Sequence, residues 1–190
     1  MIDISKETAV VFPGQGSQVI GMGSDLYEKS SIAKDIFDEV DDTLGRKLTD
    51  IIFSGSQETL NKTENAQPAI TATSLACFSV FNEKFKNFTP SVTAGHSLGE
   101  YTSLSASNVL SISDTIRLVS ERGRLMQIAC DKNPGGMVAI IGMEIDVVEE
   151  VCREAGAYPS NVNSSQQVII SGDNDSLAIA VDLAKARGAK

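Results

Sequence analysis

Apolar residues recur along this chain in two alternating patterns, short runs rich in β-branched side chains and longer stretches with helical spacing. Residues 8–12 form an apolar run that stops at Pro13, which predicts a buried strand followed by a turn. Residues 31–44 place their apolar side chains on one stripe of a helix, and Gly45 follows as a stop. The chain is therefore expected to open with a strand and a helix.

The same alternation continues through the middle of the chain. Pro68 suits the first turn of a helix, so a second long helix is predicted to begin at Gln67. Residues 91–95 predict a strand that runs into a sharp turn, and residues 111–129 predict a third helix. That helix is expected to turn four apolar side chains inward, namely those of Ile116, Val119, Met126 and Ala129. Strands that alternate with helices favour an α/β fold around a mostly parallel sheet.

The composition changes at residues 133–136, where the sequence reads Asn-Pro-Gly-Gly. Beyond this break the pattern predicts a strand, a helix, a second strand and a second helix, over residues 137–142, 146–155, 167–171 and 176–186. This order resembles a split βαβ unit of the ferredoxin-like kind, which would need one more strand after its second helix. We therefore expect a large α/β domain over residues 1–132 and a ferredoxin-like subdomain, incomplete at its C-terminus, over residues 137–190.

The charge balance narrows the possible partners. The chain has 16 Lys and Arg residues against 25 Asp and Glu residues, a formal net charge of −9 that argues against a nucleic acid partner. No apolar run approaches the roughly 18 residues that a membrane-spanning helix needs, and the acidic start of the sequence does not look like a signal peptide. We expect a cytoplasmic protein that binds neither nucleic acid nor membrane.

Cysteine and histidine are scarce in this sequence. The three cysteines, Cys77, Cys130 and Cys152, are odd in number and far apart, which fits reduced thiols rather than a disulfide framework. His96 is the single histidine, so a multi-histidine metal site is excluded and no bound metal is expected.

The strongest chemical signal is the pentad Gly-His-Ser-Leu-Gly at residues 95–99, between a predicted strand and a predicted helix. In that setting the two glycines permit a tight, strained turn that presents the Ser97 hydroxyl above the sheet edge. The backbone N–H of Leu98 would then face the position where an oxyanion forms. Ser97 is therefore the candidate nucleophile, and the alternative is an ordinary glycine-rich connection between a strand and a helix.

His96 is not expected to be the base for this nucleophile. Adjacent residues at the end of a strand point to opposite faces, so the His96 ring should diverge from the Ser97 hydroxyl. A base must lie within about 2.6–3.2 Å of the group whose proton it takes. We expect His96 to pack against the turn or to orient it, and the base to lie outside this sequence.

Two further groups could bind an acyl substrate. The loop at residues 13–18, Pro-Gly-Gln-Gly-Ser-Gln, lacks the spacing of a phosphate-binding motif. It should leave the sheet at the same edge as Ser97, where Gln15 could donate an amide N–H to an acyl oxygen.

Arg122 has a planar guanidinium group whose paired N–H donors match the two oxygens of a carboxylate. Taken alone, however, a helical arginine beside Glu121 is more often an ordinary surface residue.

Four segments, taken together, strongly resemble the malonyl-CoA:acyl-carrier-protein transacylase family of bacterial type II fatty-acid synthesis. They are residues 13–18, 66–69, 95–101 and 121–127, and they occur in the family's order with similar spacing. Members of this family have a hydrolase-like large domain and a ferredoxin-like small one. The resemblance implies that Ser97 takes a malonyl group from malonyl-CoA and passes it to the phosphopantetheine thiol of acyl carrier protein, with no permanently bound cofactor.

The resemblance also implies roles for residues around Ser97. Gln15 and the N–H of Leu98 would form the oxyanion hole. Arg122 would clamp the malonyl carboxylate, which overrides its interpretation as a surface residue. Leu98 is similar to the residue found in malonyl-selective members. Three further positions resemble residues that line the acyl pocket: Gln67, Met126 and Asn163.

The sequence departs from the family in one respect, since the family's base histidine follows the last strand of the small domain, beyond residue 190. The resemblance therefore covers an N-terminal portion of about two thirds of the enzyme, and we expect the 190-residue chain to be poorly active or inactive by itself. The alternatives left open are a serine hydrolase, an acyltransferase of other selectivity, and a non-catalytic module that binds an acyl group or the acidic carrier protein. The module would need a basic patch, formed by Lys84 and Lys86 or by Arg122 and Arg124.

Overall fold

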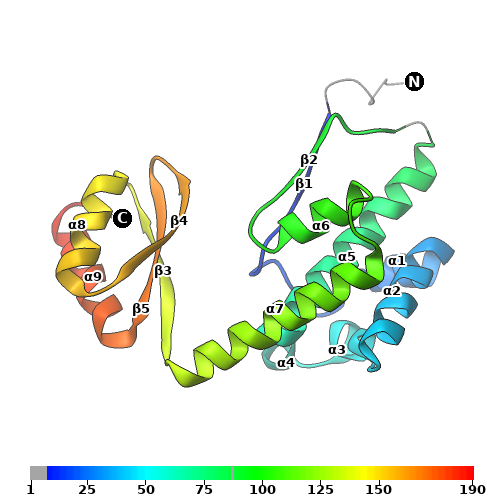
Figure 1. The fold of residues 1–190 in the computed structure, drawn as a ribbon, viewed down its shortest axis with the longest axis horizontal. Coiled ribbons are helices and arrows are strands. Elements are labelled where there is room, and N and C mark those ends of the chain that lie inside the picture. Colours follow the sequence, from blue (N-terminus) through cyan, green and yellow to red (C-terminus); the bar gives the residue numbers. More distant parts are fainter. Residues whose placement is uncertain (1–7, 87) are drawn as a thin grey trace. The chain divides into compact units, whose positions relative to one another are not determined.

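The computed structural model describes residues 8–86 and 88–190. The chain divides into two compact units, Met1–Gln127 and Ile128–Lys190, and helix α7 (Ile112–Lys132) contains the point at which the first unit ends. Figure 1 shows the order of the elements, in which helices are interspersed with strands and two consecutive strands precede the last helix. The fold is therefore α/β.

The first unit contains a parallel pair of strands, β1 (Ala9–Phe12) and β2 (Val92–Gly95). Their last residues, Phe12 and Gly95, lie opposite each other, so both strands end at the same edge of the sheet. For these two strands, the pairing confirms the parallel arrangement that the alternation of strands and helices predicts. The segments that follow Phe12 and Gly95 start side by side, and they contain the two glycine-rich motifs.

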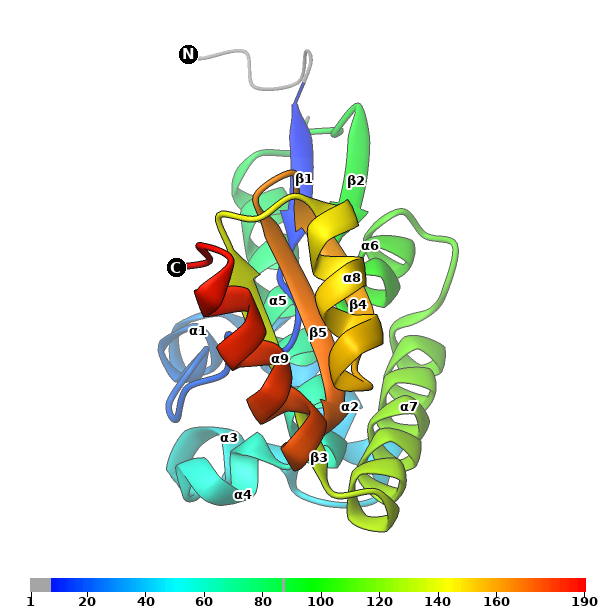
Figure 2. The ribbon, with the colours of Figure 1, turned by 90° about the vertical axis from the view of Figure 1, so that its left-hand side faces the viewer.

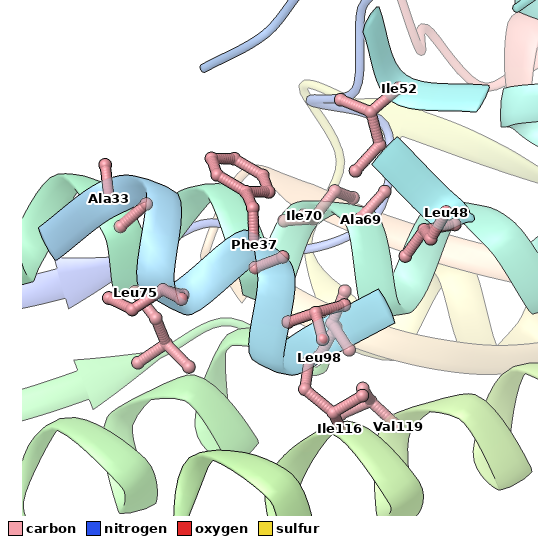
Figure 3. Close-up of a cluster of buried hydrophobic side chains, with 14 of the residues drawn as sticks. Ala33, Phe37, Leu48, Ile52, Ala69, Ile70, Leu75, Leu98, Ile116 and Val119 are labelled. Carbon is pink, nitrogen blue, oxygen red and sulfur yellow. The ribbon is translucent and has the colours of Figure 1, made fainter. Parts of the chain in front are cut away.

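The helices of the first unit pack around one apolar cluster. They are α1 (Ser24–Lys29), α2 (Ser31–Leu44), α3 (Leu48–Ser54), α4 (Gln57–Asn61), α5 (Thr63–Lys84), α6 (Gly99–Ala106) and α7. The predicted helix over residues 31–44 is confirmed as α2, with the Ser30 side chain capping its start and Gly45, at a φ of 62°, ending it. Buried side chains from α2, α3, α5 and α7, together with Leu98, contribute to this cluster (Figure 3).

Helix α5 begins at Thr63 rather than at Gln67, so the predicted start of this helix is wrong. Pro68 lies inside the helix and has no N–H to donate to the Glu64 carbonyl one turn earlier. The Nη2 atom of Arg46 donates a hydrogen bond to that carbonyl oxygen instead, at 3.4 Å. The additional turn places Gln67 within a buried stretch of helix.

The inward face of α7 differs in part from the prediction. Ile116 and Val119 are fully buried, but Met126 and Ala129 are exposed, so the prediction is wrong for these two. Gly123 lies where α7 meets α5, since a Cβ atom there would come within 2.6 Å of a backbone oxygen of α5. Beyond this contact the helix leaves the apolar cluster, and Met126 is available for other contacts.

The second unit contains a three-stranded antiparallel sheet and two helices. Its elements are β3 (Gly135–Ile141), α8 (Ile145–Ala155), β4 (Tyr158–Ser164), β5 (Gln167–Asp173) and α9 (Asn174–Ala186). The strand order is β3-β5-β4, and α8 and α9 lie side by side on one face of the sheet (Figure 2). Val148, Val151 and Ile170 are fully buried in the apolar cluster that these helices and strands form.

Strand β4 is not predicted by the sequence pattern. The segment contains Pro159 and several Asn and Ser residues, which have low strand propensity. It pairs with β5 through a register that shifts between Pro159 and Asn161 and again between Val162 and Ser164. Pairing with an apolar neighbour, rather than its own side chains, makes this segment a strand.

Three further features of the described residues bear on function. Within residues 8–86 and 88–190, no helix combines the length and the apolarity needed to span a membrane. The same residues hold no group of three or more His, Cys, Asp and Glu side chains placed to bind a metal ion. Cys77, Cys130 and Cys152 are free thiols.

Candidate active site

A sharp turn connects β2 to α6 and carries Ser97. Ser97 has a φ of 51°, in the left-handed region that non-glycine residues seldom occupy. A Cβ atom on Gly95 would lie 1.9 Å from the carbonyl carbon of Gly99, and one on Gly99 would lie 2.3 Å from the carbonyl oxygen of Phe12. Both glycines are needed for this close approach of backbone segments, so the structure has the strained turn that the pentad predicts.

The loop after β1 packs directly against this turn. The backbone N–H of His96 donates a hydrogen bond to the Phe12 carbonyl oxygen at 3.1 Å. A Cβ atom on Gly14 would lie 2.8 Å from Nδ1 of His96, so glycine is needed for the His96 ring to lie this close to the loop. The ring therefore contacts the loop that carries Gln15, which fits the orienting role expected for His96.

Arg122 on α7 points to Ser97. Its Nη2 atom donates a hydrogen bond to Oγ of Ser97 at 2.9 Å. The Glu121 carboxylate instead accepts two hydrogen bonds from Arg124, both at 2.7 Å, which hold the pKa of Glu121 below its usual value. Arg122 therefore contacts the candidate nucleophile, and its neighbour Glu121 is bound to Arg124.

Gln67 on α5 links Arg122 to two other candidate residues. Its side chain is fully buried, and its Oε1 atom accepts a hydrogen bond from Nη1 of Arg122 at 2.6 Å. Its Nε2 atom donates to the sulfur of Met126 at 3.1 Å and faces Oε1 of Gln15 at 3.5 Å. The structure thus brings four of the predicted residues together around Ser97.

Tyr101 belongs to this site but was not predicted. The centroid of its ring lies 5.7 Å from the guanidinium carbon of Arg122. A cation at this distance from an aromatic ring is attracted to the π face of the ring. Its place near the site could have been inferred from the sequence, because Tyr101 lies in the first turn of the helix that follows the pentad.

The backbone N–H of Leu98 is available at the start of α6. The Leu98 side chain is fully buried, and its backbone occupies the N-cap position of the helix. Within the described part of the chain this N–H donates no hydrogen bond, as a group that is to bind an oxyanion requires. Gln15 is exposed in the loop after β1, with its side-chain oxygen facing Gln67. The joint action of Leu98 and Gln15 as an oxyanion hole stays a prediction.

In the described part of the chain, the side chain that contacts the Ser97 hydroxyl is one that cannot act as a base. Among residues 8–86 and 88–190, the hydrogen-bond partner of the Ser97 Oγ atom is Arg122, and a guanidinium group cannot accept a proton. The His96 ring lies against Gly14. The structure therefore places a cation beside Ser97. That the base is a histidine outside this sequence stays a prediction from the family resemblance.

Asn163, the remaining predicted pocket residue, lies on β4 in the second unit. Its Nδ2 atom donates a hydrogen bond to Oε1 of Gln167 at 3.3 Å. Its role in an acyl pocket stays a prediction.

Comparisons with known proteins point to one family. The acyl transferase domain family matches residues 9–190. The malonyl CoA-acyl carrier protein transacylase of Bacillus subtilis (strain 168) is 45% identical over 187 residues, which cover 96% of this chain and 58% of that protein. The protein of the same name from Haemophilus influenzae is 43% identical over 189 residues, which cover 97% of this chain and 61% of that protein.

Solved structures show the same similarity. The malonyl CoA-acyl carrier protein transacylase of Coxiella burnetii has a TM-score of 0.91 at 36% identity, and the match covers 100% of this chain and 61% of that one. A malonyl-transacylase solved in complex with its type II PKS acyl-carrier protein has a TM-score of 0.91 at 42% identity, covering 97% and 61% of the two chains. The present chain spans about three fifths of the length of these relatives.

Proposed function

Since this chain belongs to the acyl transferase domain family, we propose that its full-length protein transfers malonyl groups from malonyl-CoA to acyl carrier protein. The chain is a homologue of malonyl CoA-acyl carrier protein transacylases, and one such relative has been solved with an acyl-carrier protein bound. Because the chain spans about three fifths of its relatives, the proposed activity is assigned to the full-length protein.

The contact between Arg122 and Ser97 carries this proposal. A malonyl ester on Ser97 would have its free carboxylate just one carbonyl carbon and one methylene carbon away from Oγ. The Arg122 guanidinium, 2.9 Å from Oγ, is within reach of that carboxylate. Arginine binds a carboxylate through two parallel hydrogen bonds, and an acetyl group has no carboxylate to accept them. The arrangement therefore favours malonyl over acetyl groups.

The proposed reaction passes through a malonyl ester of Ser97. Oγ attacks the thioester carbonyl carbon of malonyl-CoA, its proton moves to a base, and the carbon–sulfur bond breaks to release coenzyme A, which takes up the proton. The phosphopantetheine thiol then gives its proton to the base and attacks the ester carbonyl carbon. The carbon–oxygen bond to Ser97 breaks, Oγ takes up the proton, and the malonyl group leaves as a thioester of the carrier protein. In both halves the N–H of Leu98 and an amide N–H of Gln15 would stabilise the oxyanion. The family resemblance assigns the base to a histidine outside this sequence.

The two units fit the proposed pair of domains. The parallel strands and the sharp turn at Ser97 support a hydrolase-like large domain. The β-α-β-β-α order of the second unit, with strand order β3-β5-β4, supports a ferredoxin-like subdomain. Fatty-acid synthesis in the cytoplasm is the setting that we propose for this activity.

Mass spectrometry of the intact full-length protein tests the proposal. After exposure to malonyl-CoA the protein should gain the mass of one malonyl group, located on Ser97 by peptide mapping, and holo acyl carrier protein should then remove it. The Ser97→Ala variant should gain no mass. A protein that gains no malonyl group, or gains it elsewhere, contradicts the proposal. Release of malonate at the same rate with and without a thiol acceptor would identify a hydrolase instead.

A further inference from the structure

We propose that Gln67 is a positioning residue that sets selectivity for carboxylate-bearing acyl groups, because it holds the Arg122 guanidinium without neutralising its charge. The inference rests on the proposed function and adds to it a residue that acts through Arg122. It starts from the position of Gln67, whose side chain is fully buried in α5.

The contacts of Gln67 define which end of its amide faces which neighbour. Its Oε1 atom accepts from Nη1 of Arg122 at 2.6 Å, and its Nε2 atom faces two acceptors, the Met126 sulfur at 3.1 Å and the Gln15 Oε1 atom at 3.5 Å. An amide satisfies this pattern because it has an acceptor at one end and two donors at the other. A side chain with acceptors at both ends would face Met126 and Gln15 with nothing to donate.

The guanidinium of Arg122 is held from three directions. Nη1 donates to Gln67, Nη2 donates to Ser97, and the ring of Tyr101 lies 5.7 Å from the guanidinium carbon. All three neighbours are uncharged. The orientation of the guanidinium group is therefore fixed by groups that leave its positive charge intact.

No carboxylate of the described residues forms an ion pair with Arg122. Glu121, its neighbour on α7, is already bound to Arg124. A half-buried cation without a protein counter-ion attracts an anionic ligand more strongly than a paired one does, because a paired cation must first give up its partner. Gln67 thus keeps Arg122 both oriented and available for the carboxylate of the substrate.

Replacing Gln67 with glutamate tests the charge argument. Glutamate has nearly the same shape, but its carboxylate would pair with Arg122 and occupy the charge meant for the substrate. The ratio of kcat/KM for malonyl-CoA to that for acetyl-CoA should fall roughly 10- to 100-fold in the Gln67→Glu full-length protein. The Asn133→Asp variant makes the same amide-to-carboxylate change at an exposed position and should leave the ratio unchanged.

A second variant and a double substitution separate positioning from general damage. Gln67→Met removes the acceptor without adding a charge, so the ratio should fall less than in Gln67→Glu. In an Arg122→Ala background, Gln67→Glu should cause no further fall in the ratio. The inference is overturned if Gln67→Glu keeps the wild-type ratio, if it slows both acyl groups equally, or if its effect persists without Arg122.

A spectroscopic measurement decides the positioning role independently of activity. In ¹⁵N spectra of the full-length protein, the two Nη signals of Arg122, assigned by their absence in Arg122→Lys, should be separate because rotation of the guanidinium is restricted. They should merge in Gln67→Met. If the wild-type protein transfers neither acyl group, the proposed function fails. Signals that are separate in the wild type and merged in Gln67→Met would still confirm that Gln67 positions Arg122. Signals that stay separate in Gln67→Met would overturn the inference.

Discussion

Nη2 of Arg122 donates a hydrogen bond to Oγ of Ser97 at 2.9 Å, although the two residues are 25 positions apart in the sequence. One comes from the turn after β2 and the other from the middle of α7. A hydroxyl group and a cation are thus held together by two different elements of the first unit. Attack on the acyl carbon by Ser97 and binding of the acyl group's carboxylate by Arg122 can therefore be tested by separate mutations.

Replacing Arg122 with alanine should separate malonyl loading from acetyl loading. A charged hydrogen bond contributes about 1.5–3 kcal/mol, so malonyl loading of Ser97 in the full-length protein should slow about 10- to 100-fold. Acetyl loading should be unchanged or faster. Initial rates with the two CoA thioesters measure this, and Arg124→Ala, which removes an exposed neighbouring guanidinium, is the control. Unchanged malonyl loading in Arg122→Ala would refute the clamp.

Gly99→Ala should destabilise the first unit. The added Cβ atom would lie 2.3 Å from the Phe12 carbonyl oxygen, and relief of such a clash costs about 1–3 kcal/mol or more. Denaturant unfolding of this chain measures the loss. Gly136→Ala is the control, because the atom nearest to its added Cβ is 3.5 Å away. Equal stability of the two variants would show that α6 can move away from β1 without cost.

His96→Ala should lower the rate of Ser97 acylation without changing the shape of its pH profile. The His96 ring contacts the loop at Gly14, so its loss should disturb the position of Gln15. A base, by contrast, would define one limb of the profile. Rates of malonyl loading across a range of pH, measured on the full-length protein, distinguish the two roles. Disappearance of that limb in the variant would identify His96 as the base after all.

Asp173 should stabilise the second unit in a pH-dependent manner. Its carboxylate accepts hydrogen bonds from the backbone N–H and the hydroxyl of Ser176 at the start of α9, at 2.8 and 2.9 Å. These bonds, the backbone one above all, hold the pKa of Asp173 below its usual value. A carboxyl group with a lower pKa in the folded state stabilises the fold above its unfolded pKa, and the effect is lost as pH falls through the folded pKa.

Asp173→Ala should therefore unfold more easily than the wild type at pH 7, and the difference should shrink below about pH 4. Thermal unfolding of this chain at several pH values measures it. Asp182→Ala removes an exposed carboxylate from the same helix and serves as the control. A deficit in Asp173→Ala that is as large at pH 3 as at pH 7 would contradict the capping role.

The elements that could be predicted carry their signals locally. Helix α2 has its cap at Ser30, its apolar stripe and its stop at Gly45 within one short segment. The turn at Ser97 could likewise be predicted because both glycines that permit it lie within two residues of the serine. Such features depend on neighbours in sequence, which a pattern records.

The features that could not be predicted depend on partners far along the chain. Gln67 and Arg122 are 55 positions apart, and no local pattern indicates the hydrogen bond between them. The family resemblance, and not the spacing of the residues, assigned both to the acyl site. The start of α5 was predicted wrongly from Pro68, because proline usually lies in the first turn of a helix. The Glu64 carbonyl, which Pro68 leaves without its usual donor, is instead bound by Arg46, a residue outside the local pattern. Strand β4 exists through its pairing with β5, and its own residues favour a loop.

The left-handed backbone at Ser97, with its φ of 51°, restricts which side chains this position can hold. A β-branched residue is strongly disfavoured at positive φ, because its second γ atom crowds the backbone. Threonine carries the same hydroxyl group as serine and would meet this penalty, whereas cysteine, which is unbranched, would avoid it. Steric constraint therefore disfavours threonine at this position independently of its reactivity.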